Sequence, residues 1–260
     1  MAVEASNIAV RFGGVAALTD VSVRIEPGRI VTVIGPNGSG KSTLFNSITG
    51  MVALAGGTVR LDGRDLADVP THRRIAAGLA RTFQTPRFDP RVSVEEAVLC
   101  GFYPKSRGTL LGTLMRVPGV SREEKAFRDR GERILADFKL SALKHMALGE
   151  LPMGQVRLVE VARAVANDPK YLLLDEPAAG LTKIEQALLS AEIRRIAESG
   201  VGVLLVEHNF GLVRALSDHT VVLDRGTLLI EGKPEALLHD AAFVDAYLGT
   251  TRANHNEARL

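Results

Sequence analysis

Hydrophobic and polar positions alternate along much of the first part of the chain. Residues 8–12 and 21–25 alternate apolar with polar side chains, which predicts two strands that each bury one face. Residues 30–34 form an uninterrupted β-branched run, which is typical of a strand buried on both faces. A helix is predicted at 41–48 and a further alternating strand at 58–61. We therefore expect the N-terminal part to be rich in strands.

The middle of the chain has a different pattern. Residues 93–96 have the spacing of a capping box and predict the start of a helix. Glycine and proline recur through 101–120, which predicts a loop or irregular insert. A second capping box at 121–124 predicts a charged helix, and a third helix is predicted at 153–166. We therefore expect this block to be helical.

The last third of the chain alternates strands with helices again. The predicted elements are a buried strand at 171–174, a helix at 182–200, a buried strand at 201–206, a hairpin at 220–230 and short helices from 234 and at 241–248. Because this alternation is typical of a parallel sheet covered by helices, the predicted fold class is α/β. We expect a core with a mainly parallel sheet, an N-terminal antiparallel β subdomain and an inserted helical subdomain at about 86–165.

Composition adds limits to this picture. Apolar residues make up 46% of the 260 residues and charged residues 24%, as in a soluble globular protein. The net charge of +2 is too small to indicate a nucleic-acid partner. Cys100 is the only cysteine, so no intrachain disulfide forms, and we expect it to be a small buried residue at a helix end. No apolar run approaches the ~18 residues of a membrane span, so a membrane connection is expected only through a partner.

A glycine-rich segment after the strand at 30–34 matches the phosphate-loop pattern G-x-x-x-x-G-K-[ST]. Its residues are Gly35, Pro36, Asn37, Gly38, Ser39, Gly40, Lys41 and Ser42. Glycines let consecutive backbone N–H groups wrap a polyphosphate, and the N-terminus of the following helix favours anions. Lys41 supplies a charge for the β and γ phosphates, Ser42 is a Mg²⁺ ligand and Thr43 bonds the α phosphate. The alternative is a glycine-rich turn that binds no nucleotide.

Two carboxylates follow the apolar strand at 172–174. In a phosphate-loop enzyme Asp175 holds Mg²⁺ through water, and Glu176 acts as general base on the attacking water or orients it. The alternative is a solvated acidic pair at a strand end. His208 follows the apolar strand at 203–206, where an imidazole can reach a γ phosphate. A satisfied structural histidine is the alternative for His208.

Together these segments resemble the ATP-binding cassette (ABC) family over nearly the whole chain. Lys41, Gln84, Gly154-Gln155, Asp175-Glu176 and His208 stand in the order and approximate spacing of that family's motifs. The resemblance implies a P-loop NTPase core, ATP and Mg²⁺ as ligands, and ATP hydrolysis. It implies one ABC ATPase domain at 1–250, with 1–85 and 166–250 as the core, 86–165 as the helical subdomain and 251–260 as a tail.

The resemblance also assigns roles to single residues. Phe12 matches the aromatic that stacks on adenine, with a core-facing strand residue as the alternative. Gln84 matches the glutamine that reaches Mg²⁺ and links the core to the helical subdomain. The family signature, which contacts the ATP bound by the opposite subunit, is occupied here by Pro152, Met153, Gly154 and Gln155.

Two positions depart from the family pattern. Pro152 stands where the signature has serine, so a hydroxyl contact to the γ phosphate is lost. Proline suits a first helical turn and the N–H groups of Gly154 and Gln155 remain, so we expect a weakened contact. Thr182 stands where the interface loop at 179–182 carries an acid, which leaves the coupling across the dimer open.

Several segments are similar to the ATPases of branched-chain amino acid importers, and more broadly of the group that takes up hydrophobic amino acids, amides and urea. They are 81–84, the insert at 101–120, 176–181 and 246–249. The resemblance implies a second, related ATPase subunit, two transmembrane permeases and, indirectly, a periplasmic or extracellular solute-binding protein. It implies a peripheral location on the cytoplasmic face of the inner membrane and no nucleic-acid partner. An export or lipid-extraction ATPase and a soluble non-transport ATPase are the alternatives.

The resemblance also implies a dock for a permease helix, in the cleft between the core and residues 86–110. Four basic residues are candidates for its lining, with a solvated charged face as the alternative: Arg87, Arg91, Lys105 and Arg107.

Overall fold

The computed structural model describes residues 1–84, 88–105, 118–240 and 243–244. It divides into two compact units, one of Met1–Arg74 with Ile193–Leu260 and one of Ile75–Glu192. Among the described residues, no helix combines the length and apolar character needed to cross a membrane.

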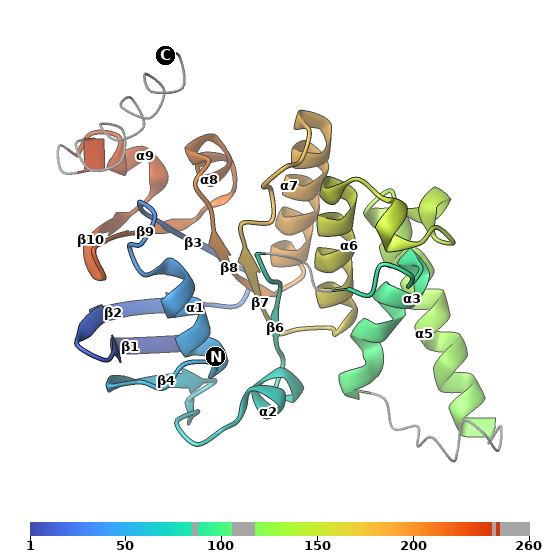
Figure 1. The fold of residues 1–260 in the computed structure, drawn as a ribbon, viewed down its shortest axis with the longest axis horizontal. Coiled ribbons are helices and arrows are strands. Elements are labelled where there is room, and N and C mark those ends of the chain that lie inside the picture. The colour runs from blue at the N-terminus through green and yellow to red at the C-terminus, as the bar shows by residue number, and fades with distance from the viewer. Residues whose placement is uncertain (85–87, 106–117, 241–242, 245–260) are drawn as a thin grey trace. The chain divides into compact units, whose positions relative to one another are not determined.

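An antiparallel sheet occupies the N-terminal part of the first unit. Its strands are β1 (Val3–Phe12), β2 (Val15–Ile25), β4 (Gly56–Leu61) and β5 (Arg64–Asp65), in the order β2-β1-β4-β5. β1 pairs antiparallel with both β2 and β4, which Figure 1 shows side by side. Alternate residues of β1 are buried, as the alternating pattern of the sequence predicts. The predicted antiparallel β subdomain is confirmed.

Four strands of a second, mainly parallel sheet belong to the same unit. β3 (Ile30–Ile34) pairs in parallel with β8 (Gly202–Val206) and with β9 (His219–Asp224), and β10 (Thr227–Gly232) pairs antiparallel with β9. Every residue of β3 and β8 is buried, which explains their runs without polar alternation. The helices of this unit include α1 (Lys41–Thr49), α8 (Phe210–Leu216) and α9 (Pro234–Leu237), and one boundary between the units falls within α2 (Thr71–Ala76).

The second unit combines two parallel strands with packed helices. β6 (Leu79–Arg81) pairs in parallel with β7 (Tyr171–Asp175). The helices are α3 (Val94–Leu99), α5 (Pro118–Asp137) and α6 (Met153–Ala166), with the 3₁₀ helices η1 (Cys100–Lys105), η2 (Ser141–Leu143) and η3 (Leu148–Glu150). The other boundary between the units falls within α7 (Lys183–Glu198). α3 packs against both α5 and α6, so this unit contains the predicted helical block.

Close packing in this helical block depends on one glycine. A Cβ at Gly101 would lie 2.2 Å from the carbonyl oxygen of Arg163, so η1 approaches α6 more closely than any side chain permits. The rings of Phe102 and Phe127 stack nearby, with centroids 4.9 Å apart. These contacts fix η1 against its neighbours α5 and α6.

The prediction for residues 101–120 is wrong at both ends. Residues up to Lys105 form η1, and α5 begins at Pro118 rather than after the capping box at 121–124. Proline fits the first turn of a helix, where its missing N–H needs no partner, so the helix extends upstream of the predicted start. Cys100, the C-cap residue of α3, is exposed rather than buried.

Some predictions fall outside the described residues. They concern most of the helix at 241–248, the tail at 251–260, and Arg87 and Arg107. The boundaries of the helical subdomain at 86 and 165 stay a prediction.

Candidate functional site

The phosphate-loop pattern lies between β3 and α1 in the first unit. Gly35, Gly38 and Gly40 have φ of 151°, 80° and 101°, values that favour glycine. A Cβ at Gly35 would lie 2.1 Å from the carbonyl oxygen of Leu223, and one at Gly40 would lie 2.6 Å from Leu18 Cδ2. The loop therefore has a backbone path that only glycine permits at these positions, as a close wrap around phosphates requires.

Lys41 folds back over this loop. Its Nζ donates hydrogen bonds to the carbonyl oxygens of Gly35 (2.8 Å) and Pro36 (2.9 Å), and the residue is only 7% exposed. The ammonium group is thus held at the mouth of the loop by neutral acceptors. An anion bound there would offer a stronger, charge-assisted acceptor to the same group.

Ser39 leaves a buried polar atom in the loop. Its Oγ is buried and has no hydrogen-bond partner among the described residues. Its main chain is fixed on both sides, since the N–H donates to Pro36 O and the carbonyl oxygen accepts from Gly226 N–H. An unsatisfied hydroxyl in a glycine-lined loop fits the binding of a polar group such as phosphate.

The other loop residues and the two flanking candidates also lie in the first unit. Asn37 and Ser42 are exposed and Thr43 is half-buried in the first turn of α1. Phe12 ends β1 with 54% of its surface exposed, so it is not a core-facing residue. His208 follows β8, two residues beyond Val206, and its side chain is 63% exposed.

The position of His208 relative to the loop follows from strand register. Val206 of β8 lies opposite Val33 of the parallel strand β3, and Gly35 lies two residues beyond Val33. His208 and Gly35 therefore leave the same edge of the sheet at equivalent positions. The alternative of a satisfied structural histidine stays open, because the main-chain N–H of His208 donates to Glu207 Oε2 at 3.3 Å.

Asp175 and Glu176 stand at the end of β7 in the second unit. Asp175 is 3% exposed, and its Oδ2 lies 3.4 Å from the guanidinium of Arg81. The N–H of Asp175 donates to Thr82 Oγ1 (3.1 Å), which ties the strand end to the segment after β6. Burial lowers the pKa of Arg81, and the negative charge of Asp175 opposes that shift. Arg81 therefore compensates the buried carboxylate.

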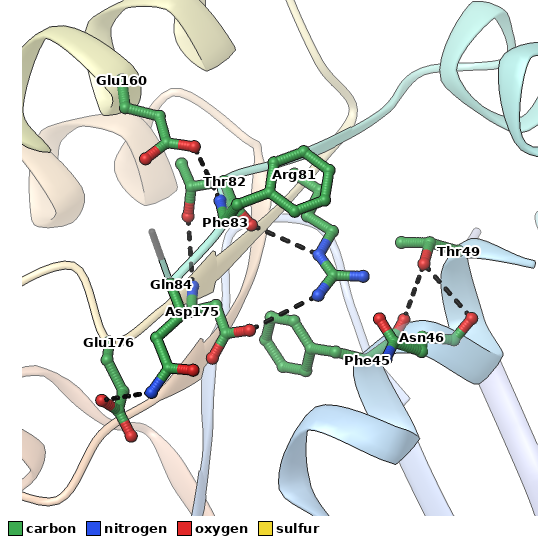
Figure 2. A network of polar contacts seen from close by, with 10 residues as sticks. All are labelled: Phe45, Asn46, Thr49, Arg81, Thr82, Phe83, Gln84, Glu160, Asp175 and Glu176. Atoms are coloured by element: carbon green, nitrogen blue, oxygen red, sulfur yellow. Dashed lines mark hydrogen bonds and ion pairs between the residues drawn. The ribbon is translucent and has the colours of Figure 1, made fainter. Parts of the chain in front are cut away.

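Gln84 reaches the second carboxylate. Its Nε2 donates to Glu176 Oε2 at 3.2 Å, so the structure brings these two predicted residues together (Figure 2). Glu176 has φ of 47°, a left-handed conformation that a non-glycine residue rarely adopts. Such local backbone strain is found preferentially at functional sites.

Helix α6 contacts the same segments through two side chains that sequence reasoning missed. Arg157 Nη1 donates to the carbonyl oxygen of Glu176 (3.1 Å), and Glu160 Oε1 accepts from the N–H of Phe83 (2.7 Å). Figure 2 shows the contact of Glu160 with Phe83 beside Gln84. Burial raises the pKa of Glu160, and the Phe83 hydrogen bond together with the positive charge of Arg163 offsets part of the rise.

A sequence signal for Glu160 exists. It is a charged residue between Val159 and Val161, inside an apolar run, and such a residue is rarely buried without a specific partner. The sequence has no comparable signal for Arg157 or Arg81. Arg157 contacts a main-chain carbonyl oxygen, a group that every residue has, and Arg81 contacts Asp175, which is 94 positions away.

The signature residues open α6. Pro152 is the N-cap residue, Met153 is exposed and Gln155 is half-buried. A Cβ at Gly154 would lie 3.1 Å from Leu181 Cδ2 and 3.3 Å from Gly180 O, so the signature packs against the predicted interface loop. Thr182 ends that loop and forms a capping box with Glu185, donating to its Oε2 at 2.9 Å. Thr182, which stands where the family pattern has an acid, therefore caps the N-terminus of α7.

The donor sets fit a nucleotide with a divalent cation. Among the described residues there is no group of three or more His, Cys, Asp or Glu side chains that could hold a metal ion alone. Within the second unit, Asp175 and Gln84 offer hard oxygen atoms, the kind of ligand that Mg²⁺ prefers.

Comparison with known proteins agrees with this chemistry. A family model described as "ABC transporter" matches residues 18–179. The chain is 36% identical over 247 residues to the high-affinity branched-chain amino acid transport ATP-binding protein BraF of Pseudomonas aeruginosa, covering 95% of this chain and 97% of that protein. It is 34% identical to the high-affinity branched-chain amino acid transport ATP-binding protein LivG of Escherichia coli K12, covering 94% and 96%.

Solved structures give the same result. An ATP-binding cassette of an ABC transporter in its ADP conformation has a TM-score of 0.82 and 32% identity, covering 96% of this chain and 99% of that one. A dimeric ATP-binding cassette in a post-hydrolysis state, bound to ADP and Pi, has a TM-score of 0.74 and 25% identity, covering 89% and 98%.

Proposed function

Since this chain belongs to the ABC transporter family of ATP-binding proteins, we propose that it binds and hydrolyses ATP to energise uptake of branched-chain or other hydrophobic amino acids, amides or urea. The observation that carries the proposal is the glycine-dependent loop between β3 and α1. Lys41 folds over this loop, and the buried Ser39 hydroxyl has no hydrogen-bond partner in the described part of the chain. The similarity to BraF and LivG over 94–95% of the chain supports the solute class.

The loop supplies the phosphate contacts. Its N–H groups wrap the polyphosphate, Lys41 contacts the β and γ phosphates and Thr43 bonds the α phosphate. Phe12 stacks on adenine, in agreement with its exposure at the end of β1. Ser42, Gln84 and, through water, Asp175 would hold Mg²⁺, which would supply positive charge next to the transferred phosphoryl group.

Glu176 acts on the attacking water. Its carboxylate accepts the water proton or orients the water toward the γ phosphorus. The new bond from the water oxygen forms as the bond from the γ phosphorus to the bridging oxygen breaks, which gives phosphate and ADP as the leaving group. The hydrogen bond from Gln84 fixes one carboxylate oxygen and leaves the other oxygen available for this contact. His208 donates to a γ-phosphate oxygen.

Complete sites require a second ATPase subunit. Pro152, Met153, Gly154 and Gln155 contact the ATP of the opposite subunit, for which a related chain is the proposed partner. The dimeric state of a solved relative supports this arrangement. Residues 1–250 act as one ATPase domain, whose helical part at 86–165 passes the motion to two permeases at the cytoplasmic face of the inner membrane, fed by a solute-binding protein.

The test compares Glu176→Gln with the wild-type chain, each assembled with its co-purified permease and ATPase partners. Hydrolysis should fall at least about 100-fold, because a general base contributes on that order, while ATP affinity stays unchanged. Glu185→Gln is unsuitable as a control, because Glu185 is half-buried and accepts the hydrogen bond from Thr182 N–H that caps α7. Glu192→Gln, on the same helix, is the control that keeps wild-type turnover.

Two outcomes would contradict the proposal. Wild-type turnover by Glu176→Gln would remove its catalytic assignment. If a lipid stimulates hydrolysis in the same reconstituted assembly and leucine and urea do not, the function of the chain is lipid extraction rather than import of these solutes.

A further inference from the structure

Two polar side chains on one face of α6 contact the two segments that contain the proposed hydrolytic residues. Arg157 and Glu160 are three positions apart, so they lie one above the other on the helix surface. Arg157 donates to the main-chain carbonyl oxygen of Glu176 and Glu160 accepts from the main-chain N–H of Phe83, the residue before Gln84. Neither contact involves a side chain that is proposed to touch nucleotide.

We propose that Arg157 and Glu160 are positioning residues for ATP hydrolysis, which hold the backbones of Glu176 and Gln84 in the geometry that hydrolysis requires. The inference rests on the proposed function, because it assigns a task within the same site. It adds a connection within one subunit, from helix α6, which begins at the signature, to Glu176 and Gln84.

The contact of Arg157 acts on a backbone that needs support. Glu176 has φ of 47°, and a non-glycine residue holds such a conformation only where its surroundings fix it. The hydrogen bond from Arg157 Nη1 fixes the carbonyl side of this residue, while Gln84 fixes its carboxylate. The Nε of Arg157 is buried without a hydrogen-bond partner in the described part of the chain, so this arginine stays in place despite a desolvation cost.

The contact of Glu160 likewise buries a polar group and fixes a main-chain segment. The residue is 2% exposed, and a carboxylate is rarely buried to this extent without a specific partner. Its 2.7 Å bond to the Phe83 N–H fixes the main chain directly before Gln84. Thr82, on the other side of Phe83, donates its N–H to Leu173 O of β7. The segment that presents Gln84 is therefore held by β7 and by α6 together.

The position of both residues on α6 connects them to the signature. Gly154 opens the helix and packs against Leu181 and Gly180, and Arg157 follows less than one turn later. A displacement of the first turn of α6 would move Arg157 and Glu160 as part of one rigid element. Glu176 and Gln84 would follow through the two main-chain hydrogen bonds.

The experiment measures steady-state hydrolysis by the full chain in its assembled complex for Arg157→Met and Glu160→Ala. We expect kcat to fall at least about tenfold with KM for ATP within about twofold, because hydrolytic geometry is lost while the phosphate loop is intact. Arg157→Lys and Glu160→Gln, which keep a donor and an acceptor, should recover most of the loss. Arg130→Met and Glu132→Ala on α5 are the matched controls and should keep wild-type kcat.

A double mutant with Gln84→Ala distinguishes a positioning role of Glu160 from a general contribution to the stability of the fold. In Gln84→Ala, Glu160→Ala should cause little further loss of kcat, since Glu160 acts through Gln84. Hydrogen exchange at the Phe83 amide should be faster in Glu160→Ala and unchanged in Glu132→Ala. If Arg157→Met or Glu160→Ala fails to fold, the same kcat comparison and the amide measurement are made on Arg157→Gln or Glu160→Asp, whose shorter polar side chains should lose the contacts with the Glu176 carbonyl oxygen and the Phe83 N–H; wild-type kcat in these variants overturns the inference.

The outcomes distinguish this inference from the proposed function. If Glu176→Gln is inactive while Arg157→Met and Glu160→Ala turn over like the wild type, the inference is wrong and the function stands. Independent, multiplicative losses from Glu160→Ala and Gln84→Ala would also overturn the role of Glu160. If Glu176→Gln itself keeps wild-type turnover, the proposed function fails first.

Discussion

Glu160 is a carboxylic acid in the interior of a helix, with 2% of its surface exposed. Removing a carboxylate from water disfavours its charged form, and burial accordingly raises the pKa of Glu160 above its ordinary value of 4.5. The hydrogen bond from Phe83 and the charges of Arg163 and Arg157 favour the carboxylate without cancelling that rise. Burial of the charged Glu160 carboxylate therefore lowers the free energy of unfolding by an amount that depends on pH.

The sign of this dependence follows from proton binding. Between the unfolded and the raised folded pKa of Glu160, the folded protein binds more protons than the unfolded chain, so the free energy of unfolding decreases as pH rises through that window. Glu160→Gln does not titrate. We predict that the melting temperature of Glu160→Gln relative to the wild type increases as pH is raised from about 4 to about 8.

Thermal melting of both proteins across this pH range is the measurement. Glu132→Gln on α5, whose side chain is 59% exposed, is the control and should show no such trend. A difference between Glu160→Gln and the wild type that stays constant or decreases with pH would contradict the effect of burial.

At the residue scale, sequence reasoning worked where neighbours in sequence are neighbours in space. The phosphate loop is a contiguous segment, and its glycines and lysine have local backbone reasons for their identity. Arg81 and Glu160 have partners that are 94 and 77 positions away, so only the folded chain shows what they contact. Gln84 was singled out only through the resemblance to a family, and its contact with Glu176, 92 positions away, was not predicted.

At the scale of elements, local capping chemistry located the start of α3, although the second capping box did not locate the start of α5. Ser93 caps α3 with a complete capping box, in which its Oγ accepts from Glu96 N–H and the Glu96 carboxylate accepts from Ser93 N–H. α3 also packs on α5 and α6, so its start is coupled to the helical block.

Loss of this cap should be measurable. We predict that Ser93→Ala lowers the free energy of unfolding by about 1 kcal/mol, because an N-cap serine contributes roughly that amount. Equilibrium denaturation with urea is the measurement. Ser141→Ala, at an exposed position of η2, is the control with little effect. An equal effect of both substitutions would show that the capping box does not stabilise α3.

Elements without a local signature were missed. α2 is short and polar, and it is stabilised by Arg74, whose guanidinium donates to the carbonyl oxygens of Val69, Ser47, Ile48 and Leu66. β6 has only three residues, too few for a period to appear. α8 contains Gly211, which weakens a helix prediction, although Asn209 caps it. By contrast, β3 and α6 have the predicted bounds, since a long apolar run or a complete helical pattern defines them.

At the scale of the whole molecule, the predicted site residues are shared between the two units. Phe12, the phosphate loop and His208 belong to the first unit, and Gln84, Asp175, Glu176 and the signature belong to the second. The small net charge of +2 indicates no general affinity for polyanions. Binding of ATP must therefore depend on the specific loop rather than on the charge of the protein.

The central claim is that the loop after β3 is a nucleotide site. Calorimetric titration of the full chain with ATP and Mg²⁺, made on the wild type, Lys41→Ala and the exposed-lysine control Lys233→Ala, tests it most directly. We predict saturable binding of one ATP per chain for the wild type and the control. Lys41→Ala should bind at least about tenfold more weakly, because a charge-assisted hydrogen bond contributes ~1.5–3 kcal/mol. Equal affinity in all three proteins, or no binding by the wild type, would contradict the account.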